Sequence, residues 1–393
     1  MKLRIALLLT AALALPAFAQ EEGPANAKGV SVDTTGKGYT AAYVLEPATK
    51  RVLLAENSDT PLPTASMAKM MTLLIAMEEI RDGRLKLDDQ VQISARSSTM
   101  GGSQIFAKQG QIFPLQTLLA ATMVQSANDA AQAIAEKIAG SSENFAEIMN
   151  QRAKALGMNH SQFYDPHGLP NPKSPQMIDT ASAHDLAILG QELMKYPLMR
   201  EYAKMPTMPF TNGTFTSGLT NPNHLINPAK RDYYPNATGI KTGYSGPAGY
   251  CVTASAKQGD MEVVAVVMGA RASYGPLSSF GIASRLFSQA FAQNIMQTVL
   301  KKGQVVGSAA VSDGSAKTVP AVASQDVKAL IKRGEQGGLK VGFVANPVAA
   351  PVRAGQQVGV VVVTQNGQQI SRVPAVAGAA VEKQSLWRKL WPF

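Results

Sequence analysis

Residues 63–72 read PTASMAKMMT, and this stretch is the most informative one in the chain. It places Ser66 and Lys69 three residues apart where an apolar helix is predicted to start, and that spacing brings both side chains to one face of a helix. A serine hydroxyl needs a base within hydrogen-bond reach to act as a nucleophile. Lysine serves as that base if apolar neighbours, such as Met70 and Met71, and a nearby cation lower its pKa. The stretch therefore predicts a nucleophile with its base.

Taken alone, a serine and a lysine at this spacing are a weak signal. They occur often by chance, and a helix-capping serine followed by an exposed lysine has the same pattern. Two further motifs strengthen the interpretation. Residues 125–129, QSAND, place Ser126 and Asn128 just after a predicted helix at 114–125. Residues 239–246, GIKTGYSG, place a Lys-Thr-Gly sequence at the end of a predicted strand.

A Ser-x-x-Lys pair combined with Ser-x-Asn and Lys-Thr-Gly sequences is typical of penicillin-binding proteins and class A β-lactamases. All three motifs occur here in the required order. The chain resembles the low-molecular-mass penicillin-binding proteins, a family of exported serine-type D-alanyl-D-alanine carboxypeptidases, over roughly residues 38–393. Four further stretches carry the resemblance: GGSQIFAKQG (101–110), QSANDAAQAIAE (125–136), LGMNHSQFYDPHGLP (156–170) and GIKTGYSGPAGYCVTASA (239–256).

The resemblance implies a reaction and assigns it to three side chains. Ser66 would attack the carbonyl of the terminal D-Ala-D-Ala bond of a peptidoglycan pentapeptide and carry the acyl group. Lys69 would take the serine proton, and Ser126 would relay a proton towards the leaving D-alanine. Water would then release the acyl-enzyme. β-Lactam antibiotics would act as inhibitors by acylating the same serine.

The resemblance also implies a set of substrate-binding residues, namely Asn128, Lys241, Thr242 and Gly243. The asparagine would hold the substrate amide and the base in place. The lysine and the threonine would bind the terminal carboxylate, and this lysine would also help to lower the pKa of the base. The glycine would leave room for the substrate to pair along the strand edge. The backbone N–H groups of Ser66 and Tyr244 would form the oxyanion hole.

Two departures from the family pattern bear on specificity. Tyr244 stands where many carboxypeptidases of this kind carry histidine or a small residue, which leaves the preference near the leaving group open. The middle motif is Ser-Ala-Asn, which favours a carboxypeptidase over a class A β-lactamase. The alternatives are a D,D-endopeptidase that uses the same residues, a β-lactamase, and a structural cell-wall protein that acylates slowly. Release of free D-alanine from a pentapeptide distinguishes the first interpretation from the others.

The pattern of helices and strands predicts an α+β fold. Residues 39–57 read as two strands around a turn, residues 64 to about 210 are mainly helical, and strands follow at 237–243, 250–256 and 261–270 before a helix at 278–293. We expect a penicillin-binding or serine β-lactamase-like domain at 38–297, with an antiparallel sheet and a helical subdomain. Valine-rich runs around an Asn-Gly hairpin signal at 366–367 predict a small β-rich domain at 298–380.

The beginning of the chain predicts export. Lys2 and Arg4 precede a short apolar run that ends in the Ala-Phe-Ala sequence at 17–19, which is the pattern of a secretory signal peptide. We therefore expect residues 1–19 to be removed, residues 20–37 to form a linker, and the enzyme to work in the periplasm or at the outer face of the membrane.

The end of the chain predicts an amphipathic membrane anchor at 381–393. On a helix, one apolar stripe would contain Leu386, Trp387, Leu390 and Trp391. From residue 301 onward there are twelve basic and four acidic residues, an excess that accounts for the net charge of the mature chain. We expect this basic end to bind an anionic membrane surface peripherally, and we expect no nucleic-acid partner.

The reactive side chains that remain predict neither a metal site nor a cofactor. The four histidines are scattered along the chain, and no Cys-x-x-Cys or His-Glu-x-x-His sequence occurs. Cys251 is the single cysteine, so an intramolecular disulfide is excluded. We expect it to be a buried, inert thiol on a strand near the cleft.

Overall fold

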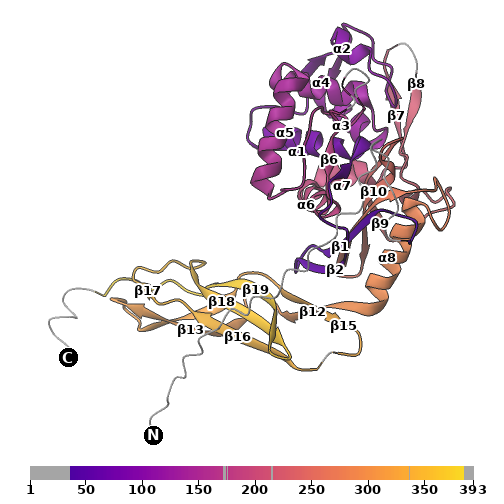
Figure 1. Cartoon of the computed structure of the whole chain (residues 1–393). Helices are drawn as coiled ribbons and strands as arrows, with labels where there is room; N and C mark the ends of the chain where they lie inside the picture. Colours follow the sequence, from indigo (N-terminus) through magenta and orange to yellow (C-terminus); the bar gives the residue numbers. More distant parts are fainter. Residues whose placement is uncertain (1–35, 171–173, 175, 214–215, 336, 385–393) are drawn as a thin grey trace, which may run out of the picture.

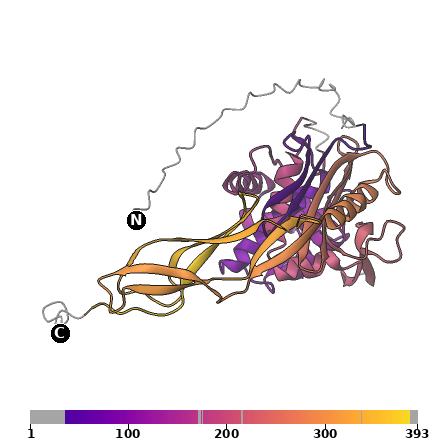
Figure 2. The ribbon, with the colours of Figure 1, turned by 90° about the horizontal axis from the view of Figure 1, so that it is seen from below.

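The computed structural model describes residues 36–384 except 171–173, 175, 214–215 and 336. This part of the chain forms an N-terminal α+β domain and an elongated C-terminal β domain that extends away from it (Figures 1 and 2). No helix of these described ranges is long and apolar enough to cross a bilayer. The predicted signal peptide, nearly all of the predicted linker and the apolar stripe of the predicted anchor, Leu386, Trp387, Leu390 and Trp391, lie outside the described residues.

The N-terminal domain is built on a five-stranded antiparallel sheet with the strand order β2-β1-β11-β10-β9. Two strands come from the start of the domain and three from its end, so the sheet joins sequence-distant pieces as predicted. The Lys-Thr-Gly motif lies on β9, the edge strand next to the helices. The strands are β1 (Ala41–Glu46), β2 (Arg51–Glu56), β9 (Ala237–Ser245), β10 (Gly249–Gln258) and β11 (Met261–Ala270).

The two faces of this sheet contact different hydrophobic cores, because successive side chains of a strand point to opposite faces. Val252 and Ala254 of β10 pack towards α8 (Ser279–Gln293), the helix predicted at 278–293. Cys251, on the opposite face of β10, belongs to the larger core under the helical part of the domain. The sheet is therefore covered on both sides.

The helices other than α8 and the 3₁₀ helix His224–Ile226 form one group against the sheet face opposite α8, and His224–Ile226 packs on the α8 side. α6 packs on β1 and β11, and α7 packs on β9. Pro114 precedes α3 and Gly157 ends α5 with a φ of 79°, as the helix-boundary signals predict. The helices are α1 (Lys69–Arg81), α2 (Ala95–Ser98), α3 (Leu115–Val124), α4 (Asn128–Ala139), α5 (Ser142–Leu156), α6 (Ala183–Leu193) and α7 (Pro197–Lys204), with the 3₁₀ helices η1 (Ala65–Ala68) and η2 (His224–Ile226).

Three short strand pairs join the loops between these helices. All three pairs are antiparallel and lie outside the main sheet. They are β3 (Leu62–Pro63) with β6 (Thr180–Ala181), β4 (Gln90–Gln92) with β5 (Ile112–Pro114), and β7 (Thr207–Thr211) with β8 (Thr216–Thr220).

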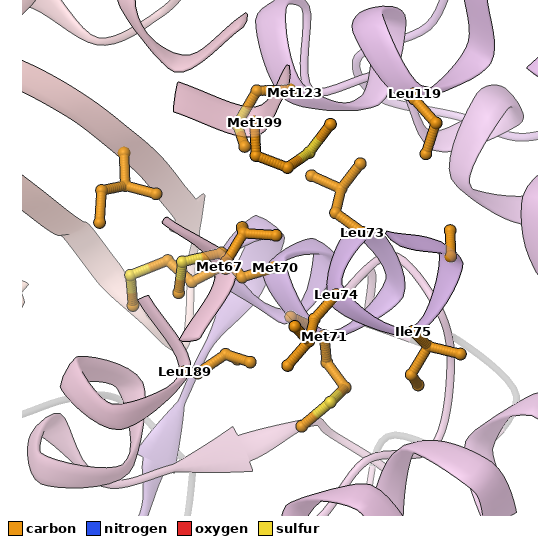
Figure 3. Packing of buried hydrophobic residues seen from close by; sticks show 14 of the residues in the cluster. Met67, Met70, Met71, Leu73, Leu74, Ile75, Leu119, Met123, Leu189 and Met199 are labelled. Atoms are coloured by element: carbon orange, nitrogen blue, oxygen red, sulfur yellow. The ribbon is translucent and has the colours of Figure 1, made fainter. Parts of the chain in front are cut away.

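Helix α1 lies in the middle of the helical group and contacts α3, α4, α5 and α6 (Figure 3). Its first nine residues, 69–77, are all buried, so this part of the helix has no face open to solvent. Leu73 and Leu74 are at most 1% exposed, and each such side chain contributes about 1.5–3 kcal/mol to folding. This packing on all sides holds the first turn of α1, and with it Lys69, in a fixed position.

The C-terminal domain is all β, as predicted, and begins directly after α8. Asn366 and Gly367 connect β18 to β19 with φ of 50° and 83°, the left-handed pair of a type I′ hairpin turn. A six-stranded sheet has the order β16-β18-β19-β14-β13-β17, and β12 pairs with β15. The strands are β12 (Asn294–Leu300), β13 (Val305–Ser312), β14 (Thr318–Ala323), β15 (Val327–Lys332), β16 (Leu339–Ala345), β17 (Val348–Ala349), β18 (Gln357–Gln365) and β19 (Gln368–Ala377).

The last described residues continue this β domain. Val381 and Lys383, where the anchor was predicted to begin, form β-bridges with Val352 and Gly314. The chain leaves the described part of the structure at the end of the β domain that lies farthest from the N-terminal domain (Figures 1 and 2).

Candidate active site

The sequence predicted Ser66 at the head of an α-helix. In the structure it lies in the short 3₁₀ helix η1, which directly precedes α1. Residues three apart eclipse each other in a 3₁₀ helix, because each turn contains three residues. The tighter turn therefore sets Lys69, the first residue of α1, next to Ser66. The Lys69 Nζ atom lies 2.9 Å from the Ser66 Oγ atom, within hydrogen-bond distance.

The side chain of Lys69 is completely buried, and the neighbouring Met67, Met70 and Met71 are buried with it (Figure 3). Burial lowers the pKa of Lys69 to about 7, although the negative charges of nearby aspartates favour its ammonium form. At neutral pH much of this lysine is therefore a neutral amine. The sequence predicted this effect of the methionine-rich surroundings.

A second serine–lysine pair faces the first. Lys241 of β9 donates a hydrogen bond of 2.7 Å to the Ser126 hydroxyl, and both residues are buried. Ser126 lies between α3 and α4 with a φ of 61°, a sparsely populated conformation for a residue with a side chain. Burial and the positive charge of Lys69 lower the pKa of Lys241 well below its usual value. The two lysines therefore compete for charge, so that protonation of one disfavours protonation of the other.

Asn128 lies at the first position of α4 and holds the loop at 101–103. Its backbone N–H donates to the Ser103 carbonyl and its Nδ2 atom to the Gly101 carbonyl, each at 2.7 Å. Its Oδ1 atom is buried and has no hydrogen-bond partner among the described residues. A buried oxygen of this kind is an acceptor for an incoming N–H group. The resemblance implied that Asn128 also holds Lys69, but a different group makes that contact in this structure.

That group is the main-chain carbonyl of His167, which accepts a 2.7 Å hydrogen bond from the Lys69 Nζ atom. The turn around His167 also contains Asp165, and both side chains are largely buried. The sequence analysis quoted this stretch only as part of the resemblance and assigned no role to it. An Asp-Pro pair followed by glycine is a turn signal, but no local pattern indicates that its carbonyl reaches a lysine 98 residues away.

The register of β9 on β10 shows which face of the sheet each residue of the Lys-Thr-Gly motif occupies. Lys241 pairs with Thr253, whose hydroxyl contacts the sulfur of Met67 in η1. Lys241 and Gly243 therefore share the face towards η1, and Thr242 is half-buried on the opposite face. A Cβ atom on Gly243 would lie 2.7 Å from the carbonyl oxygen of Thr64, so the room that this glycine leaves is occupied by the chain just before Ser66.

Tyr244 presents its side chain on the face away from Ser66. Its ring stacks on that of Tyr250, the partner residue on β10, with 4.4 Å between the ring centres, and 60% of the residue is exposed. Only its backbone is thus available for the predicted oxyanion hole, for which the N–H groups of Ser66 and Tyr244 remain the candidates.

Cys251 pairs with Gly243 in this register and lies on the same side of the sheet as Lys241. It is 1% exposed, and burial raises the pKa of its thiol to about 12. The prediction that this thiol is buried is confirmed, and a raised pKa agrees with a thiol of low reactivity.

Comparisons with known proteins find matches along most of the chain. The sequence profile of D-alanyl-D-alanine carboxypeptidases matches residues 28–272, and that of the C-terminal domain of penicillin-binding protein 5 matches residues 296–383. The chain belongs to the D-alanyl-D-alanine carboxypeptidase family. The resemblance deduced from the motifs is therefore confirmed, as is the α+β fold with a following β domain.

Individual members of the carboxypeptidase family match along most of the chain. The D-alanyl-D-alanine carboxypeptidase DacF of Bacillus subtilis is 34% identical over 346 residues, which cover 87% of this chain and 86% of that protein. Among solved structures, PBP3 of Streptococcus pneumoniae has a TM-score of 0.77 at 26% identity and covers 88% of this chain and 99% of its own. Penicillin binding protein 5 of Haemophilus influenzae has a TM-score of 0.73 at 26% identity, covering 88% of this chain and 98% of its own.

Proposed function

We propose that this protein removes the terminal D-alanine from peptidoglycan pentapeptides through an acyl-enzyme on Ser66. The observation that carries the proposal is the 2.9 Å contact between the Ser66 hydroxyl and the amine of Lys69. Burial lowers the pKa of that amine to about 7, which suits a general base at neutral pH. Membership of the carboxypeptidase family gives the substrate class.

In the acylation step, neutral Lys69 takes the proton of Ser66 while the serine oxygen bonds to the carbonyl carbon of the D-Ala-D-Ala link. The negative charge on the carbonyl oxygen is stabilised by the backbone N–H groups of Ser66 and Tyr244. Ser126 passes a proton to the leaving nitrogen, and its contact with Lys241 supports replacement of that proton. Free D-alanine leaves, and water then hydrolyses the ester to restore the Ser66 hydroxyl.

Binding of the substrate also sets the protonation of the two lysines. The terminal carboxylate of the peptide would lie at Lys241, on the face towards η1, and its negative charge favours the ammonium form of Lys241. Because the two lysines compete for charge, an ammonium on Lys241 favours the neutral amine on Lys69. The substrate thus promotes the protonation states that acylation requires. The buried Oδ1 atom of Asn128 is placed to accept a hydrogen bond from the peptide backbone.

β-Lactams would act on the same serine. The amide of a penicillin takes the place of the D-Ala-D-Ala link, and its carbonyl carbon bonds to Ser66. The C–N bond of the ring breaks, but the leaving nitrogen remains tethered within the acyl group and stays in the site, so water hydrolyses the ester to Ser66 slowly. Covalent labelling by a fluorescent penicillin is therefore a direct probe of the proposed nucleophile.

The experiment that tests the function is incubation of the purified mature protein with a pentapeptide that ends in D-Ala-D-Ala. Free D-alanine is the expected product. A D,D-endopeptidase would instead cut cross-linked peptides and leave the pentapeptide intact. A slow structural binder would take up the penicillin label without releasing D-alanine, and a β-lactamase would hydrolyse the penicillin with rapid turnover.

We also propose that the enzyme is exported and held at the outer face of the membrane. The signal-peptide pattern at 1–19 supports export, and the basic excess after residue 300 with the stripe of Leu386, Trp387, Leu390 and Trp391 supports peripheral binding to an anionic bilayer. The described chain ends at Gln384, at the end of the β domain that lies farthest from the N-terminal domain (Figure 1), so the β domain would act as a spacer.

A further inference from the structure

Two buried carboxyl groups that the proposed reaction does not use lie near Lys69. Asp165 lies in the turn at 165–169, in the loop between α5 and β6. Asp179 immediately precedes β6. Their negative charges act on Lys69, and the Asp179 Oδ1 atom accepts a 3.3 Å hydrogen bond from the Asp165 backbone N–H. Burying carboxyl groups is unfavourable unless they are hydrogen-bonded or neutral, so this pair calls for a structural or chemical reason.

Asp165 shapes the turn that holds Lys69. Its Oδ1 atom accepts hydrogen bonds from the backbone N–H groups of His167, at 2.8 Å, and Gly168, at 2.6 Å. Side-chain acceptors of this kind fix a turn locally. The carbonyl of His167 is thereby directed at the Lys69 Nζ atom, 2.7 Å away. The neighbouring Pro166 carbonyl accepts a 2.7 Å hydrogen bond from Thr72 of α1, which ties the same turn to the helix that carries the base.

The turn also packs against the segment before the nucleophile. Gly168 has a φ of 78°, and a Cβ atom at this position would lie only 1.9 Å from the Ala65 carbonyl oxygen. The turn therefore contacts both η1 and α1, the two elements that carry Ser66 and Lys69. A shift of the turn would move the nucleophile relative to its base.

Asp179 anchors the turn from the other side. Its Oδ1 atom accepts a 2.6 Å hydrogen bond from the backbone N–H of Tyr164, and its main-chain carbonyl accepts one of 2.9 Å from the N–H of Thr64. One residue thus connects the turn to the chain two residues before Ser66.

The pKa values of the two carboxyl groups are shifted in opposite directions. Burial raises the pKa of Asp179 well above its usual value, and the negative charge of Asp165 raises it further. The Asp179 Oδ2 atom has no hydrogen-bond partner among the described residues, as suits a neutral acid. Burial alone would also raise the pKa of Asp165, but the hydrogen bonds and the charge of His167 outweigh it and lower that pKa. Asp179 therefore holds a proton more readily than Asp165 does.

We propose that Asp165 is a positioning residue for the general base: its side chain shapes the turn whose carbonyl holds Lys69, and Asp179 anchors that turn from the other side. The inference rests on the proposed function, in which Lys69 is the base. Two other titratable groups act on the lysine pair, Asp129 from α4 and Lys241 from β9, and the His167 imidazole lies 2.7 Å from the Asp165 carboxyl; all three stay in place in the experiment below.

The test compares Asp165→Asn, Asp165→Ala and Asp179→Asn in the full mature protein. The rate of acylation by a fluorescent penicillin is measured between pH 5 and 9, together with the melting temperature. Asp165→Asn keeps an oxygen for the two turn N–H groups but removes the charge that favours the Lys69 ammonium. The midpoint of the acid limb should therefore move to lower pH by on the order of one unit, with the plateau rate within a few-fold of the wild type.

The other two variants separate charge from geometry. Because Asp179 holds a proton more readily than Asp165, Asp179→Asn should move the acid midpoint less than Asp165→Asn does, even if the rate falls. Asp165→Ala removes the acceptor as well, and its plateau rate should fall by about tenfold or more, since small displacements of a base are costly.

An unchanged midpoint in Asp165→Asn would overturn the inference while leaving the proposed function intact. A shift in Asp179→Asn as large as that in Asp165→Asn would overturn the order of the two pKa values. Wild-type protein that takes up no penicillin and releases no D-alanine would overturn the proposed function, and the inference with it.

Discussion

Gly243 on β9 lies against the main chain of Thr64, so closely that a Cβ atom at position 243 would be 2.7 Å from the Thr64 carbonyl oxygen. Contacts below 3.0 Å do not occur at real Cβ atoms, so the strand and η1 approach each other as closely as a glycine permits. This contact sets the distance between the Ser66 backbone and the strand that carries Lys241 and Tyr244.

We therefore predict that Gly243→Ala disturbs the site more than the fold. The methyl group must push η1 away from β9, which separates the two N–H groups of the proposed oxyanion hole. Acylation by a fluorescent penicillin should slow by about 10- to 100-fold, with a stability cost of about 1–3 kcal/mol. Gly246→Ala is the matched control, because nothing lies within 4 Å of a Cβ atom there. Equal rates in the two variants would contradict the prediction.

Ser66→Ala should abolish covalent labelling by penicillin. The substitution removes the only hydroxyl within hydrogen-bond distance of Lys69 among the described residues, and the residue is partly exposed, so little packing is lost. The measurement is in-gel fluorescence after incubation with the labelled penicillin, and circular dichroism checks the fold. Labelling that persists in the alanine variant would show that another residue is the nucleophile.

The pH dependence of acylation should report the pKa of Lys69. Burial lowers that pKa to about 7, and only the neutral amine accepts the serine proton. The rate should therefore be highest above pH 7 and should fall about tenfold per unit as the pH drops well below it. A wild-type rate that stays constant from pH 8 to pH 5 would exclude this lysine as the base.

Lys69→Arg should lose nearly all acylation at every pH, because arginine keeps its proton throughout this range. The matched control is Lys137→Arg on the exposed surface of α4, which should label like the wild type. Substantial labelling of Lys69→Arg would contradict the assignment of the base.

Lys241→Gln should discriminate between two forms of the same peptide. A glutamine still forms hydrogen bonds to Ser126, but it does not neutralise a carboxylate. Hydrolysis of a peptide with a free C-terminus should fall about 10- to 100-fold more than that of its C-terminally amidated form, as expected for loss of a charged hydrogen bond. The comparison of kcat/KM for the two peptides provides its own control. Equal losses would place Lys241 elsewhere in the mechanism.

Deletion of residues 385–393 should release the mature protein from anionic vesicles without changing its penicillin labelling. The shorter chain keeps the β-bridge between Lys383 and Gly314, so the β domain remains complete. Binding is measured by co-sedimentation at low salt, and vesicles of neutral lipid are the control because attraction to the basic end depends on lipid charge. Full-length mature protein that stays in the supernatant with anionic vesicles would contradict the anchor.

The sequence by itself determined those features that depend on local geometry. The pairing of Ser66 with Lys69 followed from a three-residue spacing, and the apolar surroundings of the lysine followed from neighbouring methionines. Helix and hairpin boundaries followed from glycine, proline and Asn-Gly signals, because these residues restrict the backbone wherever they occur. The fold class followed from the order of helices and strands together with the family motifs.

The tertiary structure decided everything that depends on contacts across the core. Local spacing does not specify that Lys241 meets Ser126 across 115 residues, and this contact was not predicted. The 3₁₀ form of η1, the outward direction of the Tyr244 ring, and the His167 carbonyl on Lys69 could not be predicted at all. They result from strand register and from the close approach of β9 and the 165–169 turn to η1, and packing of this kind is set by the whole fold rather than by any one segment.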